Sequence, residues 1–229
     1  MNLIVAVLLC ISSVVLAKPA TSLTEAEFTN MTFTLTRLDS ILTAYAKYKE
    51  FVPSYIYDPI DSMTDAQKAT VVDFVNDYHA GAFNPANYTE MAAIVEANYT
   101  NLYSMMSTMY TTYQEHVAQL GPGGQAYAAN VEAKLYADAN PDRIIWACNL
   151  FNNAKSVVSQ AKALLDDSSE SEAIEEAFPE AVTFLNSKEF AAYAIVVDNL
   201  KPLDCTKDRA QIFNTIKLFD SQSVLTSKD

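Results

Sequence analysis

Residues 91–120 read MAAIVEANYTNLYSMMSTMYTTYQEHVAQL, and this stretch decides the fold class. Its apolar side chains recur every three or four positions, the spacing that places them on one face of an α-helix. We therefore predict a long amphipathic helix here, with a break near Asn98. The positions that follow the spacing are Leu102, Met105, Met106, Met109, Tyr110, Tyr113, Val117 and Leu120.

The spacing of apolar residues by three or four positions continues on both sides of this stretch. Residues 28–52 predict one helix that Pro53 ends, and the capping-box pattern TDAQ at 64–67 predicts the start of another that closes at Gly81. The Gly-Pro-Gly-Gly run at 121–124 is the strongest break, and amphipathic segments follow it, the first a short helix around Tyr127 to Tyr136. No alternating run demands a strand. We predict an all-α, single compact domain of about eight to eleven helices.

Composition supports this fold class and narrows the function. The chain has 229 residues and only four glycines, too few for the many turns of a β-sandwich or barrel. Its formal net charge is -13, and no basic stripe is present to neutralise phosphates. These features exclude nucleic acid as a partner.

The N-terminus carries an uncharged apolar run, LIVAVLLCISSVVLA at residues 3–17. A run of this kind that ends on a small residue is typical of a cleaved secretory signal peptide, here residues 1–17. A membrane-spanning helix is the alternative, because the run is at the short edge of the required length. We expect the mature chain, from Lys18 onward, to be secreted and extracellular, without stable membrane insertion.

Export has consequences for cysteines and asparagines. Cys10 lies in the predicted signal peptide, which leaves Cys148 and Cys205 in the mature chain. An even number of cysteines in an oxidising compartment predicts a disulfide between them, and two unpaired thiols are the alternative. Three N-x-Thr sequons are predicted glycosylation sites. Their asparagines are Asn30, Asn87 and Asn98.

Motifs for catalysis or metal binding are missing from the sequence. His79 and His116 do not form an HxxxH or HExxH pattern, and the glycine positions do not fit GxSxG, a P-loop or GxGxxG. The acidic run from Glu170 to Glu176 is interpreted as the solvated face of a helix. We expect no catalytic residue, no metal and no cofactor, and therefore no enzyme.

Four segments, taken in their order along the chain, indicate a more specific class of protein. They read YKEFVP at 48–53, SMTDAQ at 62–67, LGPGGQAYAANVEAKL at 120–135 and FPEAVTFLNSKEF at 178–190. Over about residues 45–193 the chain resembles the secreted fatty acid- and retinol-binding proteins of nematodes. The resemblance implies a compact helical fold around an apolar cavity that holds fatty acids and retinol or related retinoids non-covalently.

The resemblance divides the chain into a central domain that matches the family's usual core and additions at both ends. The expected organisation is a signal peptide at 1–17, an N-terminal helical extension at 18–44, a lipid-binding helical domain at 45–195, and a C-terminal amphipathic extension and tail at 196–229. Both extensions and the two mature cysteines depart from the family's usual core. Tyrosine and methionine also replace many charged residues on the predicted helix at 98–120.

The binding residues are expected from apolar helix faces, because no ligand motif of the family carries over position by position. A ligand carboxylate is costly to bury unpaired, so it should reach water or a cation at the cavity mouth. The expected cavity wall is Val71, Phe74, Val75, Met105, Met106, Met109, Tyr113, Trp146, Leu150 and Phe184. The candidate carboxylate partners are Lys134, Arg143, Lys155 and Lys162, for which ordinary exposed charges are the alternative.

Two functions remain open from the sequence. The first is a secreted carrier of long-chain fatty acids and retinoids, which would contact membranes transiently to transfer lipid. The second is an extracellular helical interaction protein with a solid core and no lipid ligand. A methionine and tyrosine stripe at helical spacing fits both, because it identifies a buried face without showing whether the space behind it is filled.

Overall fold

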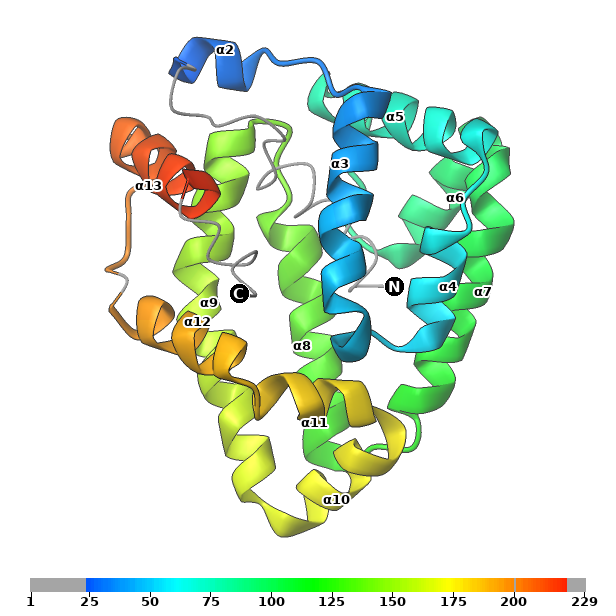
Figure 1. Cartoon of the computed structure of the whole chain (residues 1–229), viewed down its shortest axis with the longest axis vertical. Helices are drawn as coiled ribbons and strands as arrows, with labels where there is room; N and C mark the ends of the chain where they lie inside the picture. Colours follow the sequence, from blue (N-terminus) through cyan, green and yellow to red (C-terminus); the bar gives the residue numbers. More distant parts are fainter. Residues whose placement is uncertain (1–23, 200, 222–229) are drawn as a thin grey trace.

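The computed structural model describes residues 24–199 and 201–221, and these form helices without a strand (Figure 1). The all-α prediction is thereby confirmed; the predicted signal peptide lies outside the described residues. The helical segments are α2 (Glu25–Thr29), α3 (Leu35–Tyr45), the 3-10 helix η2 (Ala46–Phe51), α4 (Ser54–Asp61), α5 (Asp65–His79), α6 (Tyr88–Asn98), α7 (Thr100–Val117), α8 (Pro122–Asp138), α9 (Arg143–Asp166), α10 (Ser168–Ala177), α11 (Pro179–Leu185), α12 (Lys188–Asn199) and α13 (Arg209–Ser221).

Local sequence explains several helix ends. The Thr64 hydroxyl accepts from the Gln67 backbone N–H at 3.2 Å, and the Gln67 side chain accepts from the Thr64 N–H at 2.9 Å. This is the predicted capping box, and it opens α5. Gly81 lies beyond the end of α5 with a φ of 77°, a conformation that favours glycine. The break near Asn98 is also observed, because α6 ends there and α7 begins two residues later.

Two segments differ from the prediction. Residues 28–52 do not form one helix: α2 ends at Thr29, and Thr34 caps α3 by accepting from the Arg37 N–H. The apolar period continues across this interruption, so periodicity alone did not locate it. The helix expected near Tyr127 begins earlier, at Pro122, because proline suits the first turn of a helix. Because short helices such as α2 and η2 count separately, the described residues form thirteen helices, compared with the eight to eleven that we predicted.

The helices pack in two groups that α9 joins. The segments α3 to α7 surround a closed core, and α8 lies beside α9 (Figure 1). Short helices α10 and α11 cross the end of the α8–α9 pair, while α12 and α13 pack on the outer side of α9. The most deeply buried side chains of the closed core include Leu38, Ile41, Ile56, Ile60, Val71, Val75, Tyr78, Met91, Met109 and Trp146.

A disulfide fixes the C-terminal part of the chain to α9. Cys148 and Cys205 are bonded, with Cα atoms 5.5 Å apart, which confirms the predicted pairing. Around it, Phe28, Ile144 and Ile212 form a second buried cluster that joins α2, α9 and α13. Within the described ranges no helix has the length and apolarity needed to cross a bilayer.

Candidate functional site

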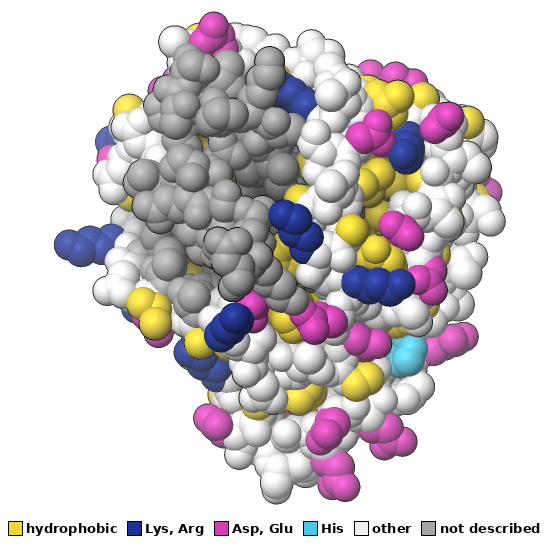
Figure 2. Space-filling model, viewed as in Figure 1, with side chains coloured by type: hydrophobic (Ala, Val, Ile, Leu, Met, Phe, Trp, Pro, Cys, Tyr) yellow, Lys and Arg dark blue, Asp and Glu magenta, His cyan; other side chains and the backbone are white. Residues whose placement is uncertain are grey.

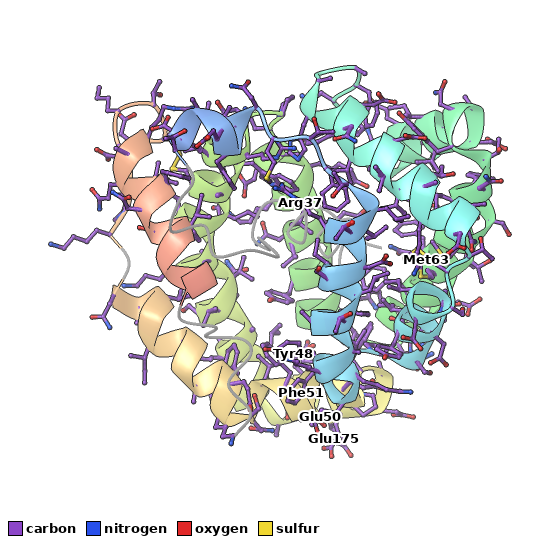
Figure 3. The ribbon with its side chains drawn as sticks, turned by 45° about the horizontal axis from the view of Figure 1, so that its top comes forward. Arg37, Tyr48, Glu50, Phe51, Met63 and Glu175 are labelled. Atoms are coloured by element: carbon purple, nitrogen blue, oxygen red, sulfur yellow. A yellow bond between two sulfur atoms is a disulfide. The ribbon has the colours of Figure 1, made fainter. Side chains whose placement is uncertain are left out.

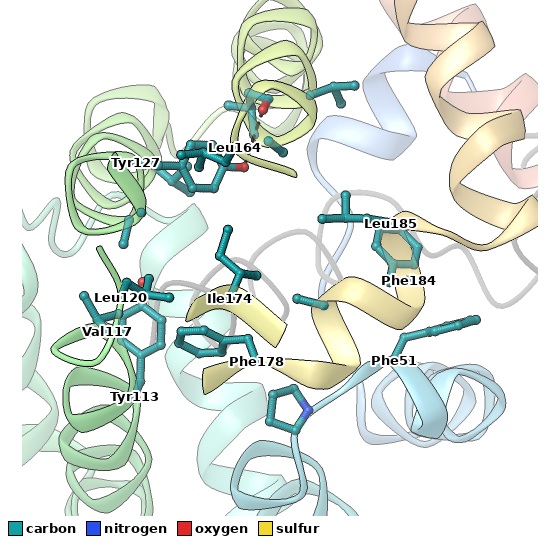
Figure 4. Close-up of a pocket in the computed structure, with 18 of the residues that line it drawn as sticks. Phe51, Tyr113, Val117, Leu120, Tyr127, Leu164, Ile174, Phe178, Phe184 and Leu185 are labelled. Carbon is teal, nitrogen blue, oxygen red and sulfur yellow. Dashed lines mark hydrogen bonds between the residues drawn. The ribbon is translucent and has the colours of Figure 1, made fainter. Parts of the chain in front are cut away.

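A pocket of about 440 Å³ lies between the α8–α9 pair and the short helices α10 and α11 (Figure 4). The end of α7 and the segment from η2 to α4 complete its wall. The lining residues are Phe51, Pro53, Tyr55, Ile56, Tyr113, Val117, Leu120, Gly124, Tyr127, Ala128, Val131, Leu135, Ala154, Val157, Val158, Ala161, Leu164, Ile174, Phe178, Ala181, Phe184, Leu185 and Phe190.

The pocket is almost entirely apolar. No aspartate, glutamate, lysine, arginine or histidine is among the described residues that line it. Its polar side-chain atoms are the hydroxyls of Tyr55, Tyr113 and Tyr127, and the last of these donates to the Val157 carbonyl at 3.4 Å. Burial raises the pKa of Tyr55, whose ring stacks on His116 at a centroid distance of 5.0 Å. This lining suits a hydrocarbon.

Small side chains create the space. On α9, residues 154 and 161 are both alanine and are separated by about two turns, so they lie on the same face. Small residues also line the pocket from α8 and α11. Large side chains at these positions would close the gap between the helices. The small lining residues are Gly124, Ala128, Ala154, Ala161 and Ala181.

One end of the pocket is held by a buried carboxylate. Glu170 on α10 is 9% exposed, and its two carboxylate oxygens accept from the backbone N–H groups of Gly123 at 2.8 Å and Gly124 at 2.9 Å. These N–H groups belong to the first turn of α8, where backbone donors lack partners within the helix. Glu170 therefore fixes α10 against α8.

This contact explains the glycine-rich sequence at 121–124. A Cβ atom on Gly121 would lie 2.7 Å from a Glu170 carboxylate oxygen, which is too close. Interpreting the whole acidic run as a solvated face was thus wrong for Glu170. The interpretation holds for the exposed Glu172, Glu175 and Glu176. Figure 2 shows acidic side chains at the lower end of the molecule, where α10 lies, and in Figure 3 Glu175 points outward there.

Two of the ten expected wall residues, Tyr113 and Phe184, line this pocket. The other eight face the closed core on the α3–α7 side, where large side chains fill the space between helices. Met105 and Leu150 are half-buried against that core. The six that are fully buried in it are Val71, Phe74, Val75, Met106, Met109 and Trp146.

None of the four candidate carboxylate partners lines the pocket. Lys134 donates to the Asn153 side chain at 3.1 Å, and Lys155 donates to the Asp198 carbonyl at 3.1 Å. The Lys162 ammonium is 5.9 Å from the ring centroid of Phe190, whose side chain lines the pocket. Arg143 is at the opposite end of α9 and only 3% exposed.

The three sequon asparagines, Asn30, Asn87 and Asn98, are exposed. Asn87 caps α6, because its side-chain oxygen accepts from the Glu90 N–H at 3.0 Å. Exposure is compatible with glycosylation, which stays a prediction.

An all-helical domain with an apolar pocket that no charged side chain lines is typical of helical proteins that bind apolar ligands. A family model described as nematode fatty acid retinoid binding protein (Gp-FAR-1) matches residues 46–195 of the chain. The chain therefore belongs to this lipid-binding family, as the sequence segments indicated. No curated protein and no solved structure matched the chain. Every residue that lines the pocket falls inside the matched range.

Proposed function

We propose that this protein is a secreted carrier that holds a long-chain fatty acid or retinol non-covalently, with the hydrocarbon in the pocket between α8, α9, α10 and α11. The observation that carries the proposal is a pocket of about 440 Å³ that has no charged lining residue and lies wholly within the family-matched range. Pockets that bind small molecules typically have about 300–1,000 Å³. Secretion rests on the apolar run that precedes Lys18.

Hydrocarbon burial supplies a large favourable free energy for this role. Each methylene removed from water contributes about 0.8 kcal/mol, so a sixteen-carbon tail gives roughly 10 kcal/mol before the costs of ordering. A micromolar dissociation constant requires about 8 kcal/mol. The gain from burying the tail is therefore of the same order as the free energy that retention requires, and it does not depend on a specific polar contact, so one site can accept ligands as different as a fatty acid and retinol.

A matched pair of substitutions on α9 tests the proposal. Ala161 lines the pocket, while Ala163 on the same helix is exposed and does not. Ala161→Phe should fill the pocket and weaken binding of a fluorescent fatty acid at least about tenfold, because several methylene groups lose their place. Ala163→Phe adds the same side chain outside the pocket and should bind like the original protein.

Thermal unfolding of both variants separates a pocket from a solid core. If the space at Ala161 is available, the larger ring should be tolerated, whereas overpacking a filled core costs typically about 1–3 kcal/mol. Destabilisation of Ala161→Phe with unaltered binding would contradict the proposed pocket. Absence of any fatty acid or retinol binding by the original protein would favour an interaction protein with no lipid ligand.

A further inference from the structure

Lys162 on α9 lies directly beside the pocket. The preceding residue, Ala161, lines the pocket, and the Lys162 ammonium is 5.9 Å from the ring centroid of Phe190, which lines it too. Lys162 is exposed, whereas Phe190 is only 6% exposed. The ammonium therefore lies where the apolar wall meets solvent, a position in which a lysine keeps its charge in water while its stem covers apolar surface.

The contacts of Lys162 distinguish it from the other candidate carboxylate partners. Lys134, Lys155 and Arg143 each donate a hydrogen bond to a side-chain or backbone oxygen. Among the described residues, none forms a hydrogen bond or an ion pair with the Lys162 ammonium, and this includes Asp166, which lies one turn further along α9. The Lys162 charge is thus available to an anionic ligand.

The distribution of charge around the pocket favours the same place. The chain has 28 acidic and 15 basic side chains, so its overall field repels an anion. Exposed Glu172, Glu175 and Glu176 add to this repulsion at α10, and Figure 2 shows acidic side chains at that lower end. Basic side chains lie at the lower left of the same view, where Figure 1 places α12. A carboxylate is therefore more favourable at the edge between α9 and α12 than at α10.

A carboxylate at Lys162 is close enough for its tail to enter the pocket. A charge-assisted hydrogen bond spans about 2.8 Å, so a carboxylate oxygen bound to the ammonium lies within about 9 Å of the Phe190 ring centroid. Because that ring borders the pocket, only the first few methylene groups lie outside. The pocket residues of α9 extend from Ala154 to Leu164, which is about 15 Å of helix and leaves room for the rest of the tail.

We propose that Lys162 binds the carboxylate of a long-chain fatty acid at the edge of the pocket between α9 and α12, while the hydrocarbon tail lies inside the pocket. This assignment rests on the proposed function and specifies the orientation of one class of ligand. Exposed ion pairs contribute little, so Lys162 adds modestly to the affinity for an acid and nothing to that for an alcohol such as retinol. It thereby sets the preference between the two head groups.

Affinities for palmitic acid and hexadecanol test the assignment, because the two ligands share a tail and differ in head group. Lys162→Glu should weaken palmitic acid at least about fivefold, since it replaces an attraction by a repulsion, and should change hexadecanol by less than about twofold. Lys188→Glu is the matched control. Lys188 is also exposed, but it is two positions from Phe190 and so faces another direction on α12. Its reversal should change neither affinity by more than about twofold.

Ionic strength gives a second readout that a merely structural effect would not produce. Salt at about 1 M shortens the screening length to about 3 Å, from about 30 Å at 0.01 M. The difference in palmitic acid affinity between the original protein and Lys162→Gln should therefore be largest at low salt and disappear at high salt. A difference that does not depend on salt would contradict an ion pair at Lys162.

Other outcomes overturn the proposal in distinguishable ways. Equal losses for acid and alcohol in Lys162→Glu, or no loss for either, would show that Lys162 does not bind the head group. An equal loss for the acid in Lys188→Glu would show that only overall charge matters. Binding of hexadecanol but not palmitic acid by the original protein would contradict the carboxylate site and leave the carrier function intact. If neither ligand binds, the proposed function itself fails.

Discussion

Removing the Glu170 carboxylate should release α10 from the first turn of α8. Each of its two hydrogen bonds, to the N–H groups of Gly123 and Gly124, joins a charged acceptor to a buried or half-buried donor. Hydrogen bonds to charged groups contribute about 1.5–3 kcal/mol each, so Glu170→Ala should lower the free energy of unfolding by about 3–6 kcal/mol. Urea unfolding followed by circular dichroism measures this change.

A double-mutant cycle with Gly121 attributes the effect to this contact. Gly121→Ala should destabilise the original protein by about 1–3 kcal/mol, because its Cβ would lie 2.7 Å from a Glu170 oxygen. In the Glu170→Ala background that clash is gone, and Gly121→Ala should cost clearly less, because only the smaller penalty of an alanine at the N-cap of α8 is left. Effects that add to within about 0.5 kcal/mol would refute the reasoning, since independent sites behave in that way. A loss below about 1 kcal/mol for Glu170→Ala would refute it as well.

Three more variants test the disulfide, the boundary between core and pocket, and a buried histidine. Replacing both Cys148 and Cys205 by serine opens a link across 57 positions and should cost about 4 kcal/mol of unfolding free energy, measured by denaturant titration against the same protein with the bond intact. Met109→Ala should cost about 2–5 kcal/mol because Met109 is buried in the closed core, whereas Val157→Ala in the pocket wall should cost clearly less; similar losses would contradict the distinction. Burial lowers the pKa of His79 from 6.5 to about 4 on folding, so protonation of His79 below pH 6.5 favours the unfolded state. The free energy of unfolding should therefore fall by about 3 kcal/mol between pH 6.5 and pH 4, and His79→Gln should abolish this loss. Parallel profiles of stability against pH for the two proteins would contradict this assignment.

Helix periodicity predicted the fold class well because most helices bury one face. It did not locate the interruption before Thr34, since the apolar spacing continues across it. Periodicity also could not show that α8 begins at Pro122, or that the distant carboxylate of Glu170 accepts hydrogen bonds from the first turn of this helix. That contact joins residues 47 positions apart in sequence, and no local pattern encodes it.

The pocket wall was harder to predict than the fold. Large apolar residues such as Phe74 and Met109 mark a buried face, but large residues fill space and so build the closed core. A usable signal was present in the small residues on the inner faces of α8 and α9, among them Ala128, Ala154 and Ala161, because they leave volume between helices. The predicted cation Arg143 is buried, which the sequence could not show, because its burial depends on α2 and α3.

Photo-crosslinking with palmitic acid that carries a diazirine near its terminal carbon tests the central claim most directly. The reagent inserts into whatever surrounds the end of the tail, and mass spectrometry of peptides locates the modified residues. If the tail occupies the pocket, label should appear on lining residues such as Val157, Leu164 and Phe178, and excess unlabelled palmitic acid should suppress it. Label confined to the closed core around Val71 and Phe74, or label that palmitic acid does not suppress, would contradict the account.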